Sequence, residues 1–301
     1  MKKIVVMGSI SIDLIIEVDK VPVIGETVMG RNYTQAFGGK GANQAVAVAR
    51  LGLDASFIGT VGSDSAGEAL IKSLHDNGVN TDYMAISKDK PTGTAVIILY
   101  KGDNYIAVDI GANMEVLNKQ VDDATEIIKH ADMVVTQLET PYDTVKHLLQ
   151  KCNAYNIPVI LNPAPAPSDK FDKSLLAMAS IITPNESETY ALTGIMAKTP
   201  DDGIKAAKRL SELGAKQIVI TLGELGCIYG SGTDFKHFPA IHVPNVVDTT
   251  GAGDSFTAAL AVALTDGETL EQAIRFATKV ASITIQTKGS QPSLPYRHQI
   301  I

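Results

Sequence analysis

Residues 247–260 read VDTTGAGDSFTAAL, a stretch in which two glycines and an aspartate lead into an apolar segment. Gly251 and Gly253 carry no Cβ, so the backbone can turn sharply here and approach a ligand closely. Residues 252–254 are expected at a helix N-terminus, where unpaired N–H groups and the helix dipole attract an anion such as phosphate. Asp254 stands where a carboxylate can take a proton from an attacking hydroxyl. The same pattern is equally typical of a tight loop with an aspartate near a helix N-cap.

The bulk composition is that of a folded globular protein. The 301 residues are 45% hydrophobic and 20% charged, which is enough chain for one large α/β domain or two small ones. The formal charge of −7 and the absence of a Lys/Arg run argue against a general nucleic-acid binder. No apolar run approaches the length of a membrane span. We therefore expect neither nucleic acid nor a membrane as a partner.

Two features bear on the cellular compartment. The N-terminus, MKKIVVMGSISIDLIIEV, begins like a signal peptide, but Asp13 and Glu17 interrupt its apolar stretch and no small-residue cleavage site follows, which favours a first β-strand. Cys152 and Cys227 lie far apart and fit core thiols in a reducing cytosol. Neither they nor the six histidines have the spacing of metal ligands. We therefore expect a cytoplasmic protein.

Short β-branched runs alternate with helical patterns along the chain. Strands are expected at Lys3–Met7, Ser56–Gly59, Met133–Gln137, Val159–Leu161, Ser180–Thr183 and Gln217–Leu222. Helices are expected at Ala42–Leu51, Ser65–Asn77 (opened by a Ser65-x-x-Glu68 capping box), Tyr142–Tyr155 and Asp201–Leu213. This alternation predicts a mainly parallel sheet covered on both faces. Ligands of such sheets bind beyond the carboxyl ends of the strands.

Two segments interrupt the alternation. Ser11–Ala36 has strand character but no helix, and Thr92–Asp109 reads as a hairpin with its turn at residues 101–104. We expect these strands to pair into a small sheet over one end of the main domain, as a lid or as a subunit interface. With no linker or repeat in the chain, the prediction is one domain, 1–301, with a discontinuous β-lid formed by about 12–36 and 92–110.

A second glycine-rich stretch, FGGKGANQAVAVARLG, spans residues 37–52. Its open backbone can lie flat against a small polyol, with Lys40 and Asn43 as hydrogen-bond donors. The alternative is a glycine turn that feeds a helix packed closely on the sheet. The chain contains no Gly-Lys-Ser/Thr of a Walker A loop. GAGDSF is not a dinucleotide-binding fingerprint either, because Phe256 occupies the position of the third small residue.

Two further motifs have a structural and a functional interpretation, and each taken alone favours the structural one. Asn185 and Glu188 in ITPNESE have the spacing of a capping pair, or would organise Mg²⁺ through water at a strand end. TLGELG (residues 221–226) is a turn or a nucleotide-phosphate contact, and LNPAPAP (residues 161–167) closes a strand with a rigid loop. Asp13 on the second strand suits two sugar hydroxyls, or a turn or pairing contact.

Seven motifs in this order and spacing resemble the PfkB (ribokinase) family of carbohydrate kinases. They are GSISID, FGGKGANQA, NPAPA, TPNESE, TLGELG, DTTGAGDSF and TKGSQPS, and the likeness runs from Val5 to about Arg297. It implies a three-layer α/β/α sandwich with a mainly parallel central sheet and a small β-lid that also forms a homodimer interface. It also implies ATP-dependent phosphorylation of the O5 hydroxyl of D-ribose.

The resemblance also implies roles for individual positions. Asp254 would be the general base, beside an anion hole of Gly251, Ala252 and Gly253. The sugar would be bound by Ser11, Ile12, Asp13, Gly39, Lys40, Gly41, Ala42, Asn43, Glu139 and Asp254. The nucleotide would be bound by Asn185, Thr221, Leu222, Gly223, Glu224, Leu225, Gly226, Gly253, Asp254 and Thr278. An activating K⁺ would be bound by Asp248, Thr250, Thr284, Thr287, Gly289 and Ser293, and Glu188 would support Mg²⁺ indirectly.

One position departs from the family pattern. Many bacterial members have Asn where this chain has Ser11, and the shorter serine offers only a hydroxyl to the sugar. The alternatives are therefore a kinase of another small sugar (2-deoxyribose, fructose, a ketodeoxy sugar acid) or of a nucleoside. A non-catalytic sugar-binding protein is a further alternative, but it has no need of a base such as Asp254 at the phosphate end. No Arg or Lys cluster that would suit a sugar phosphate is visible.

Overall fold

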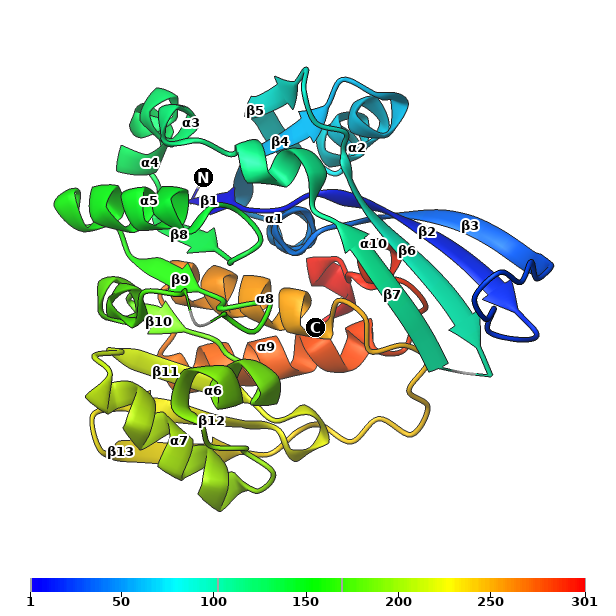
Figure 1. Cartoon of the computed structure of the whole chain (residues 1–301). Coiled ribbons are helices and arrows are strands. Elements are labelled where there is room, and N and C mark those ends of the chain that lie inside the picture. Colours follow the sequence, from blue (N-terminus) through cyan, green and yellow to red (C-terminus); the bar gives the residue numbers. More distant parts are fainter. Residues whose placement is uncertain (1, 102, 169, 301) are drawn as a thin grey trace.

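A nine-stranded sheet forms the centre of the computed structural model, which describes residues 2–101, 103–168 and 170–300 (Figure 1). The strand order is β13-β12-β11-β10-β9-β8-β1-β4-β5, and only the pairings β11–β12 and β12–β13 are antiparallel. The strands are β1 Lys3–Met7, β4 Asp54–Gly62, β5 Val79–Ser87, β8 Met133–Thr136, β9 Val159–Leu161, β10 Ile181–Ile182, β11 Gln217–Thr221, β12 Cys227–Ser231 and β13 Asp234–Phe238. The predicted mainly parallel sheet is confirmed.

Strand β1 shows why both faces of this sheet are covered. Ile4 and Val6 belong to one buried hydrophobic cluster, whereas Val5 and Met7 belong to the other, because successive side chains point to opposite faces. The first cluster is covered by α1 Lys40–Arg50, α2 Ser65–Asp76, α8 Ala252–Asp266 and α9 Leu270–Thr284. The second is covered by α3 Asn118–Asp123, α4 Thr125–Lys129, α5 Tyr142–Ala154, α6 Glu186–Thr193 and α7 Pro200–Glu212.

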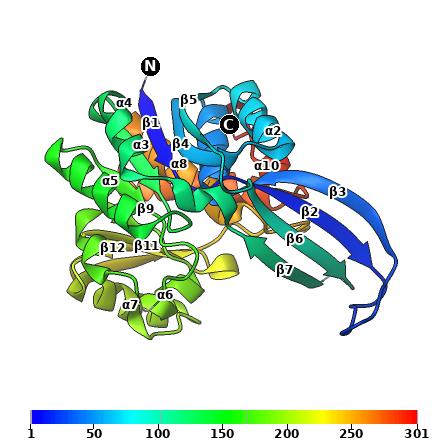
Figure 2. The same cartoon turned by 45° about the horizontal axis from the view of Figure 1, so that its top comes forward.

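A separate four-stranded sheet extends away from the main body (Figure 2). Its order is β3-β2-β6-β7, with β2 Ser11–Val18, β3 Gly30–Gly38, β6 Gly93–Tyr100 and β7 Asp103–Asp109. The two irregular segments of the sequence therefore pair with each other, since β2 lies parallel to β6 and antiparallel to β3. The β6–β7 hairpin is confirmed, and its predicted turn includes Gly102, which lies outside the described residues.

The predicted start of one helix and the predicted cap of another are wrong, although α2 does begin at Ser65 as predicted. Helix α1 begins at Lys40 and not at Ala42, because Gly39, with φ of 89°, turns the chain into the helix two residues earlier. The capping box at Ser65 does not form, since the preceding Asp64 is the N-cap and its carboxylate accepts from Gly67 N at 2.8 Å. The same carboxylate accepts a hydrogen bond from the Thr92 hydroxyl at 2.6 Å, next to the start of β6.

Short helices complete the chain: η1 Gly111–Glu115, η2 Lys173–Met178, η3 Gly223–Leu225, α10 Ser290–Ser293 and η4 Arg297–Gln299. Within the described ranges, we find no helix with the length and apolar character needed to cross a bilayer.

Candidate active site

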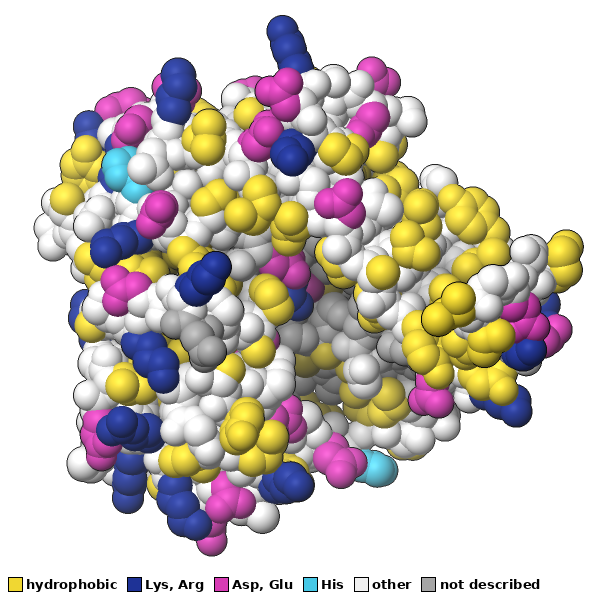
Figure 3. All heavy atoms as spheres, in the orientation of Figure 1, with side chains coloured by type: hydrophobic (Ala, Val, Ile, Leu, Met, Phe, Trp, Pro, Cys, Tyr) yellow, Lys and Arg dark blue, Asp and Glu magenta, His cyan; other side chains and the backbone are white. Residues whose placement is uncertain are grey.

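A polar pocket of about 200 Å³ lies where β9, β10 and β11 end and α8 begins. It is lined by Lys40, Asn162, Ala164, Thr183, Asn185, Glu188, Thr221, Thr249, Gly251, Gly253, Asp254 and Thr257. On this face the molecule is hollowed between the small sheet and the main body (Figure 3). The pocket brings together residues from the glycine-rich loop, TPNESE, TLGELG and DTTGAGDSF, motifs that are up to about 200 residues apart in the sequence.

The N-terminus of α8 points N–H groups into this pocket. Gly251 is the N-cap in the left-handed conformation, with φ of 81°, and Ser255 N closes the first helical turn by donating to Gly251 O at 2.8 Å. Ala252 N donates to Thr249 O at 3.2 Å, so this N–H, predicted to be free, has an acceptor. The N–H groups of Gly253 and Asp254 have no acceptor within the helix and are available to an anion.

Asp254, one turn into this helix end, is buried with 8% exposure. Its Oδ2 accepts from Asn43 Nδ2 at 2.8 Å and its Oδ1 accepts from Gln44 Nε2 at 3.1 Å. Asn43 therefore contacts Asp254 although 211 positions separate them. Gln44 belongs to the FGGKGANQA motif, but the sequence predicts no role for it, because it looks like one more residue of an alanine-rich helix.

Lys40 lies between the carboxylates of the site. Burial lowers the pKa of its ammonium group, but Asp254, Glu139 and Glu188 together raise it, and the net pKa lies above the usual value. Lys40 therefore stays protonated at neutral pH. A half-buried cation among three acids is suited to the charge of a phosphate group that enters the pocket.

The residues predicted to bind the sugar gather at the junction of β2 and the main sheet. Burial raises the pKa of Asp13 to about 6, a hydrogen bond from Ser11 at 3.4 Å opposes this shift, and Glu139 adds to it. Glu139 itself accepts a hydrogen bond from the Ser9 hydroxyl. Asn113 supports this corner, because its amide pairs with both Ile10 N at 2.8 Å and Ile10 O at 2.9 Å. No motif points to Asn113.

The glycine-rich loop is close-packed, as its structural interpretation predicts. A Cβ on Gly41 would lie 2.7 Å from the Gly8 backbone, and one on Gly39 would lie 2.5 Å from Ile10 Cα. Contact this close requires glycine, and it places Lys40 at the pocket and Asn43 against Asp254. Ala42 is fully buried in the core and Ile12 is nearly so, so these two could offer only their backbone to a ligand.

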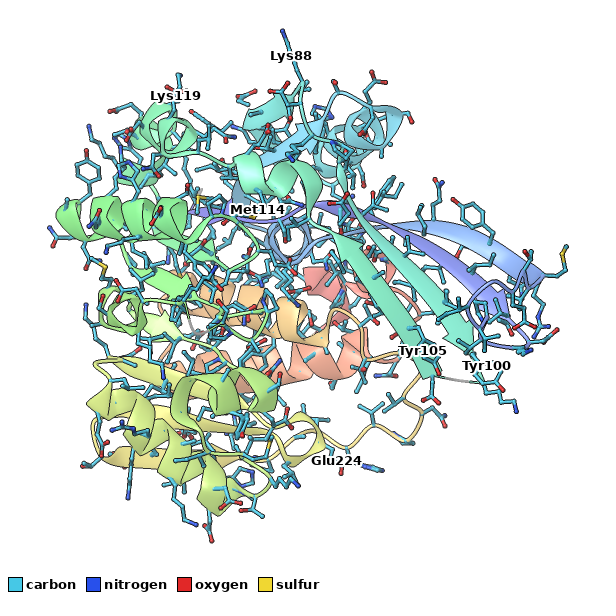
Figure 4. The ribbon with its side chains drawn as sticks, in the orientation of Figure 1. Lys88, Tyr100, Tyr105, Met114, Lys119 and Glu224 are labelled. Carbon is cyan, nitrogen blue, oxygen red and sulfur yellow. The ribbon has the colours of Figure 1, made fainter. Side chains whose placement is uncertain are left out.

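The predicted nucleotide residues divide into two groups. Asn185 and Glu188 form the expected capping box of α6, with Asn185 Oδ1 accepting from Glu188 N at 2.9 Å, and both line the pocket together with Thr221. Residues 222–226 form the expected turn, closed by Leu222 N and Gly226 O at 2.8 Å, and Glu224 extends from it into solvent (Figure 4). Thr278 is buried on α9 and does not line the pocket.

The segments predicted to bind K⁺ meet beside Gly251, against which Ser290 packs. Asp248 Oδ1 accepts from Thr250 N at 2.9 Å and Oδ2 accepts from Gly289 N at 2.8 Å. Burial raises the pKa of Asp248, but these hydrogen bonds hold it below its usual value. Thr284 donates to Val280 O and Ser293 donates to Ser290 O, while Thr287 N donates to Thr284 O. The segments thus supply a carboxylate, hydroxyls and carbonyls, which are hard-cation ligands.

A divalent cation would find few protein ligands. Among the described residues, no group of three or more His, Cys, Asp or Glu side chains could hold a metal ion. Burial raises the pKa of Glu188, and the hydrogen bond from Asn185 N opposes the shift. One or two carboxylates, water and the phosphates of a ligand are a normal coordination set for Mg²⁺, so the pocket fits that ion.

Five pocket residues carry no prediction: Asn162, Ala164, Thr183, Thr249 and Thr257. Asn162 and Ala164 belong to NPAPA and Thr249 to DTTGAGDSF, so the motifs mark the region but not the residue.

A larger hollow of about 530 Å³ between α8, α9 and the C-terminal residues combines Arg275, Lys279 and Arg297 with Asp266 and Glu268. It contains none of the motif residues.

Comparisons with known proteins agree with this geometry. Residues 1–297 match the sequence profile of the family described as pfkB family carbohydrate kinase. A ribokinase of Bacillus subtilis (strain 168) is 42% identical over 300 residues, which cover 100% of this chain and 98% of that protein. A deoxyribokinase of Salmonella typhi is 35% identical and covers 97% of this chain and 95% of its own. The structure of Arabidopsis thaliana ribokinase complexed with ribose and ATP superposes with a TM-score of 0.93 at 35% identity, over 99% of this chain and 97% of that one.

Alanine at the two glycines of the α8 N-terminus is expected to have different effects on stability. Gly251→Ala forces a Cβ into a left-handed position 3.1 Å from Ser290 Cα, so the free energy of unfolding should fall by about 1–2 kcal/mol or more. Gly253→Ala meets no atom within 4 Å and lies inside a helix, so stability should be kept. Urea unfolding of both variants checks this, and equal losses would contradict the assigned helix start.

Proposed function

Because the chain belongs to the pfkB family of carbohydrate kinases, we propose that it transfers the γ-phosphoryl group of ATP to the O5 hydroxyl of D-ribose. One observation carries the proposal: the buried carboxylate of Asp254 shares a pocket with the free N–H groups of α8 and with the protonated Lys40. A proton acceptor thus lies beside an anion site, which is what phosphoryl transfer to an alcohol requires.

In the proposed reaction, Asp254 accepts the proton of the O5 hydroxyl as the oxygen attacks phosphorus. The N–H groups of Gly253 and Asp254 and the ammonium of Lys40 stabilise the negative charge on the transferring group. The left-handed turn at Gly251 aims these N–H groups at the pocket. Catalysis would rest on positioning and electrostatics, as in other phosphoryl transfers.

ATP would reach this site from the side of β10 and β11. Asn185 and Thr221 line the pocket beside the turn at residues 222–226, and we assign that turn to the nucleotide. A bound Mg²⁺ would neutralise charge on the phosphates, with Glu188 as its indirect support.

The sugar would lie between the small sheet and the pocket. Asp13 and Glu139 would accept hydrogen bonds from its hydroxyls, and Lys40 and Asn43 would donate to it. A second candidate substrate is 2-deoxyribose, favoured by the short Ser11 side chain and by the 35% identity to a deoxyribokinase. Ribose remains the first candidate because the 42% identical relative is a ribokinase and the Arabidopsis ribokinase structure holds ribose.

We propose that the loops around Asp248 and Gly289, next to Gly251, bind K⁺. Asp248 joins Thr250 to Gly289, and Ser290 lies against Gly251, so a cation held there would neutralise charge next to the anion site. Its ligands would come from the predicted set of Asp248, Thr250, Thr284, Thr287, Gly289 and Ser293.

We assign the small sheet to a lid that also forms a homodimer interface. Val96 of β6 and Ile106 and Val108 of β7 are exposed apolar residues of this sheet, and hydrophobic side chains gather on the same lobe in Figure 3. Tyr105 stands near the free end of the hairpin (Figure 4). Exposed apolar surface of this kind marks interaction sites. A cytoplasmic location agrees with the two buried thiols, Cys152 and Cys227.

The first test is ribose-dependent release of ADP. Wild-type protein should form ADP from ATP only when a sugar is present, and Asp254→Asn should lower kcat by roughly 10²–10⁴-fold because the general base is lost. Ribose binding by calorimetry should persist in the variant. A variant with near-wild-type kcat would remove Asp254 from the base role, and ribose binding without any ADP release by the wild type would favour a non-catalytic binding protein.

The same assay separates the candidate sugars. Ribose, 2-deoxyribose, fructose, a ketodeoxy sugar acid and nucleosides are compared by kcat/KM, in wild type and in Ser11→Asn. A higher kcat/KM for 2-deoxyribose than for ribose in the wild type would replace ribose as the substrate.

Ribose affinity should depend on the ionisation of Asp13. With a pKa of about 6, Asp13 is ionised above pH 6 and can accept two sugar hydroxyls, whereas protonation below pH 6 removes part of that capacity. The Kd for ribose, measured without nucleotide, should therefore rise roughly tenfold from pH 7 to pH 5. Asp13→Asn is the control and should bind weakly at both values, and a wild-type Kd that does not change with pH would contradict the sugar-binding role.

Activity should depend on the monovalent cation. Replacement of K⁺ by Na⁺ at constant ionic strength should lower kcat, because a smaller ion fits the oxygen ligands around Asp248 less well. A salt of a large organic cation serves as the background. Equal kcat in K⁺, Na⁺ and the background salt would contradict the assignment of this loop.

A further inference from the structure

Gln44 and Gln137 form a buried chain of side-chain amides that ends on Asp254. Both glutamines have 0% exposure, which is rare for this residue type. Gln137 Nε2 donates to Gln44 Oε1 at 2.6 Å, and Gln44 Nε2 donates to Asp254 Oδ1 at 3.1 Å. Buried amides need a reason, because they lose water and must be satisfied by the protein.

The direction of both hydrogen bonds between Gln137, Gln44 and Asp254 follows from chemistry. An ionised Asp254 only accepts, so the Gln44 atom that faces it must be the nitrogen, and the Gln44 oxygen must then face Gln137. The Gln137 atom at that contact is therefore its nitrogen.

Asn162 imposes the same direction independently. Its Nδ2 donates to the backbone oxygen of Thr183 at 2.8 Å, so its Oδ1 faces Gln44 Nε2, at 3.3 Å. Two separate constraints thus give one orientation of the Gln44 amide.

The main sheet holds the two glutamine side chains rigidly. Gly8, Gln137, Asn162 and Thr183 each directly follow one of the neighbouring strands β1, β8, β9 and β10. Gln137 packs on Gly8, where a Cβ would lie 1.8 Å from Gln137 Oε1, and this oxygen has no hydrogen-bond partner among the described residues. A buried acceptor left unpaired is costly, so the position of Gln137 is maintained against a cost in stability.

Asp254 is consequently held from both sides. Asn43 donates to one oxygen and Gln44 to the other, so the carboxylate cannot rotate without losing a hydrogen bond. A carboxylate oxygen can accept two hydrogen bonds, so each keeps capacity for a substrate hydroxyl. Since Asp254 lines the pocket, a fixed carboxylate plane also fixes where that hydroxyl must be.

We propose that Gln44 and Gln137 are positioning residues that hold the Asp254 carboxylate in its reactive orientation. The proposal rests on the proposed function, in which Asp254 is the general base. Gln44 acts directly on Asp254, and Gln137 acts only through Gln44.

The test compares kcat and ribose KM in Gln44→Met, Gln137→Met and the double variant, since methionine keeps the length of glutamine without its hydrogen bonds. Gln44→Met should lower kcat roughly 10–100-fold and change ribose KM less than threefold. Gln137→Met should lower kcat roughly 3–10-fold. The double variant should match Gln44→Met, because Gln137 has no other route to the carboxylate.

Two further variants separate positioning from general destabilisation. Gln120→Met removes an amide that donates to Gly59 O, outside the pocket, and should keep wild-type kcat. In the Asp254→Asn background, Gln44→Met should cause no further loss of kcat. Circular dichroism and thermal unfolding show whether each variant is folded. If Gln44→Met does not fold, the kcat of Gln137→Met tests the positioning role instead.

Three outcomes would overturn the positioning role: kcat of folded Gln44→Met within twofold of wild type, a loss that appears only in KM, or a loss that adds in full to that of Asp254→Asn. High turnover in Asp254→Asn itself would overturn the proposed base. An inactive Asp254→Asn beside a fully active Gln44→Met would overturn the positioning role alone.

Discussion

The hydrogen bonds between α1 and the buried carboxylate of Asp254 are the interaction on which the rest of the site depends. A carboxylate at 8% exposure is stable only when its oxygens have donors, and Asn43 and Gln44 provide them from the other end of the chain. Helix α1 must therefore lie against the start of α8. That approach is possible only because Gly41 packs directly on the Gly8 backbone, where any side chain would clash.

The same junction connects the two sheets. Residues 8–10 pass from β1 of the main sheet to β2 of the small sheet, and Gly39 joins β3 to α1. The acidic groups Asp13 and Glu139 and the carboxylate of Asp254 therefore lie on either side of one short region, with Lys40 between them.

Sequence patterns predicted the class of the sheet, the β6–β7 hairpin, the Asn185–Glu188 cap and the helix start at Gly251, because each depends on neighbours in the chain. They missed the Asp64 cap, since Ser65 offers an equally plausible local capping box and only the contact with Thr92 favours Asp64. They also missed Asn113, Gln44 and Gln137. Asn113 and Gln137 lie outside every motif, and Gln44 lies in one that does not indicate its role. The partners of all three lie about 90 to 210 positions away.

The sequence by itself determined the parts that short-range physics controls: alternating hydrophobic strands and helices, glycines where the backbone must turn, and an aspartate beside a helix N-terminus. It left the glycine-rich loop and TPNESE divided between a structural and a functional role. The tertiary structure confirms the structural role of both, and it shows that the capping pair and the close-packed loop place Lys40, Glu188 and Asp254 around one pocket. Which side chains satisfy a buried carboxylate is a question of distance in space, and chain order carries no information about that distance until the sheet has formed.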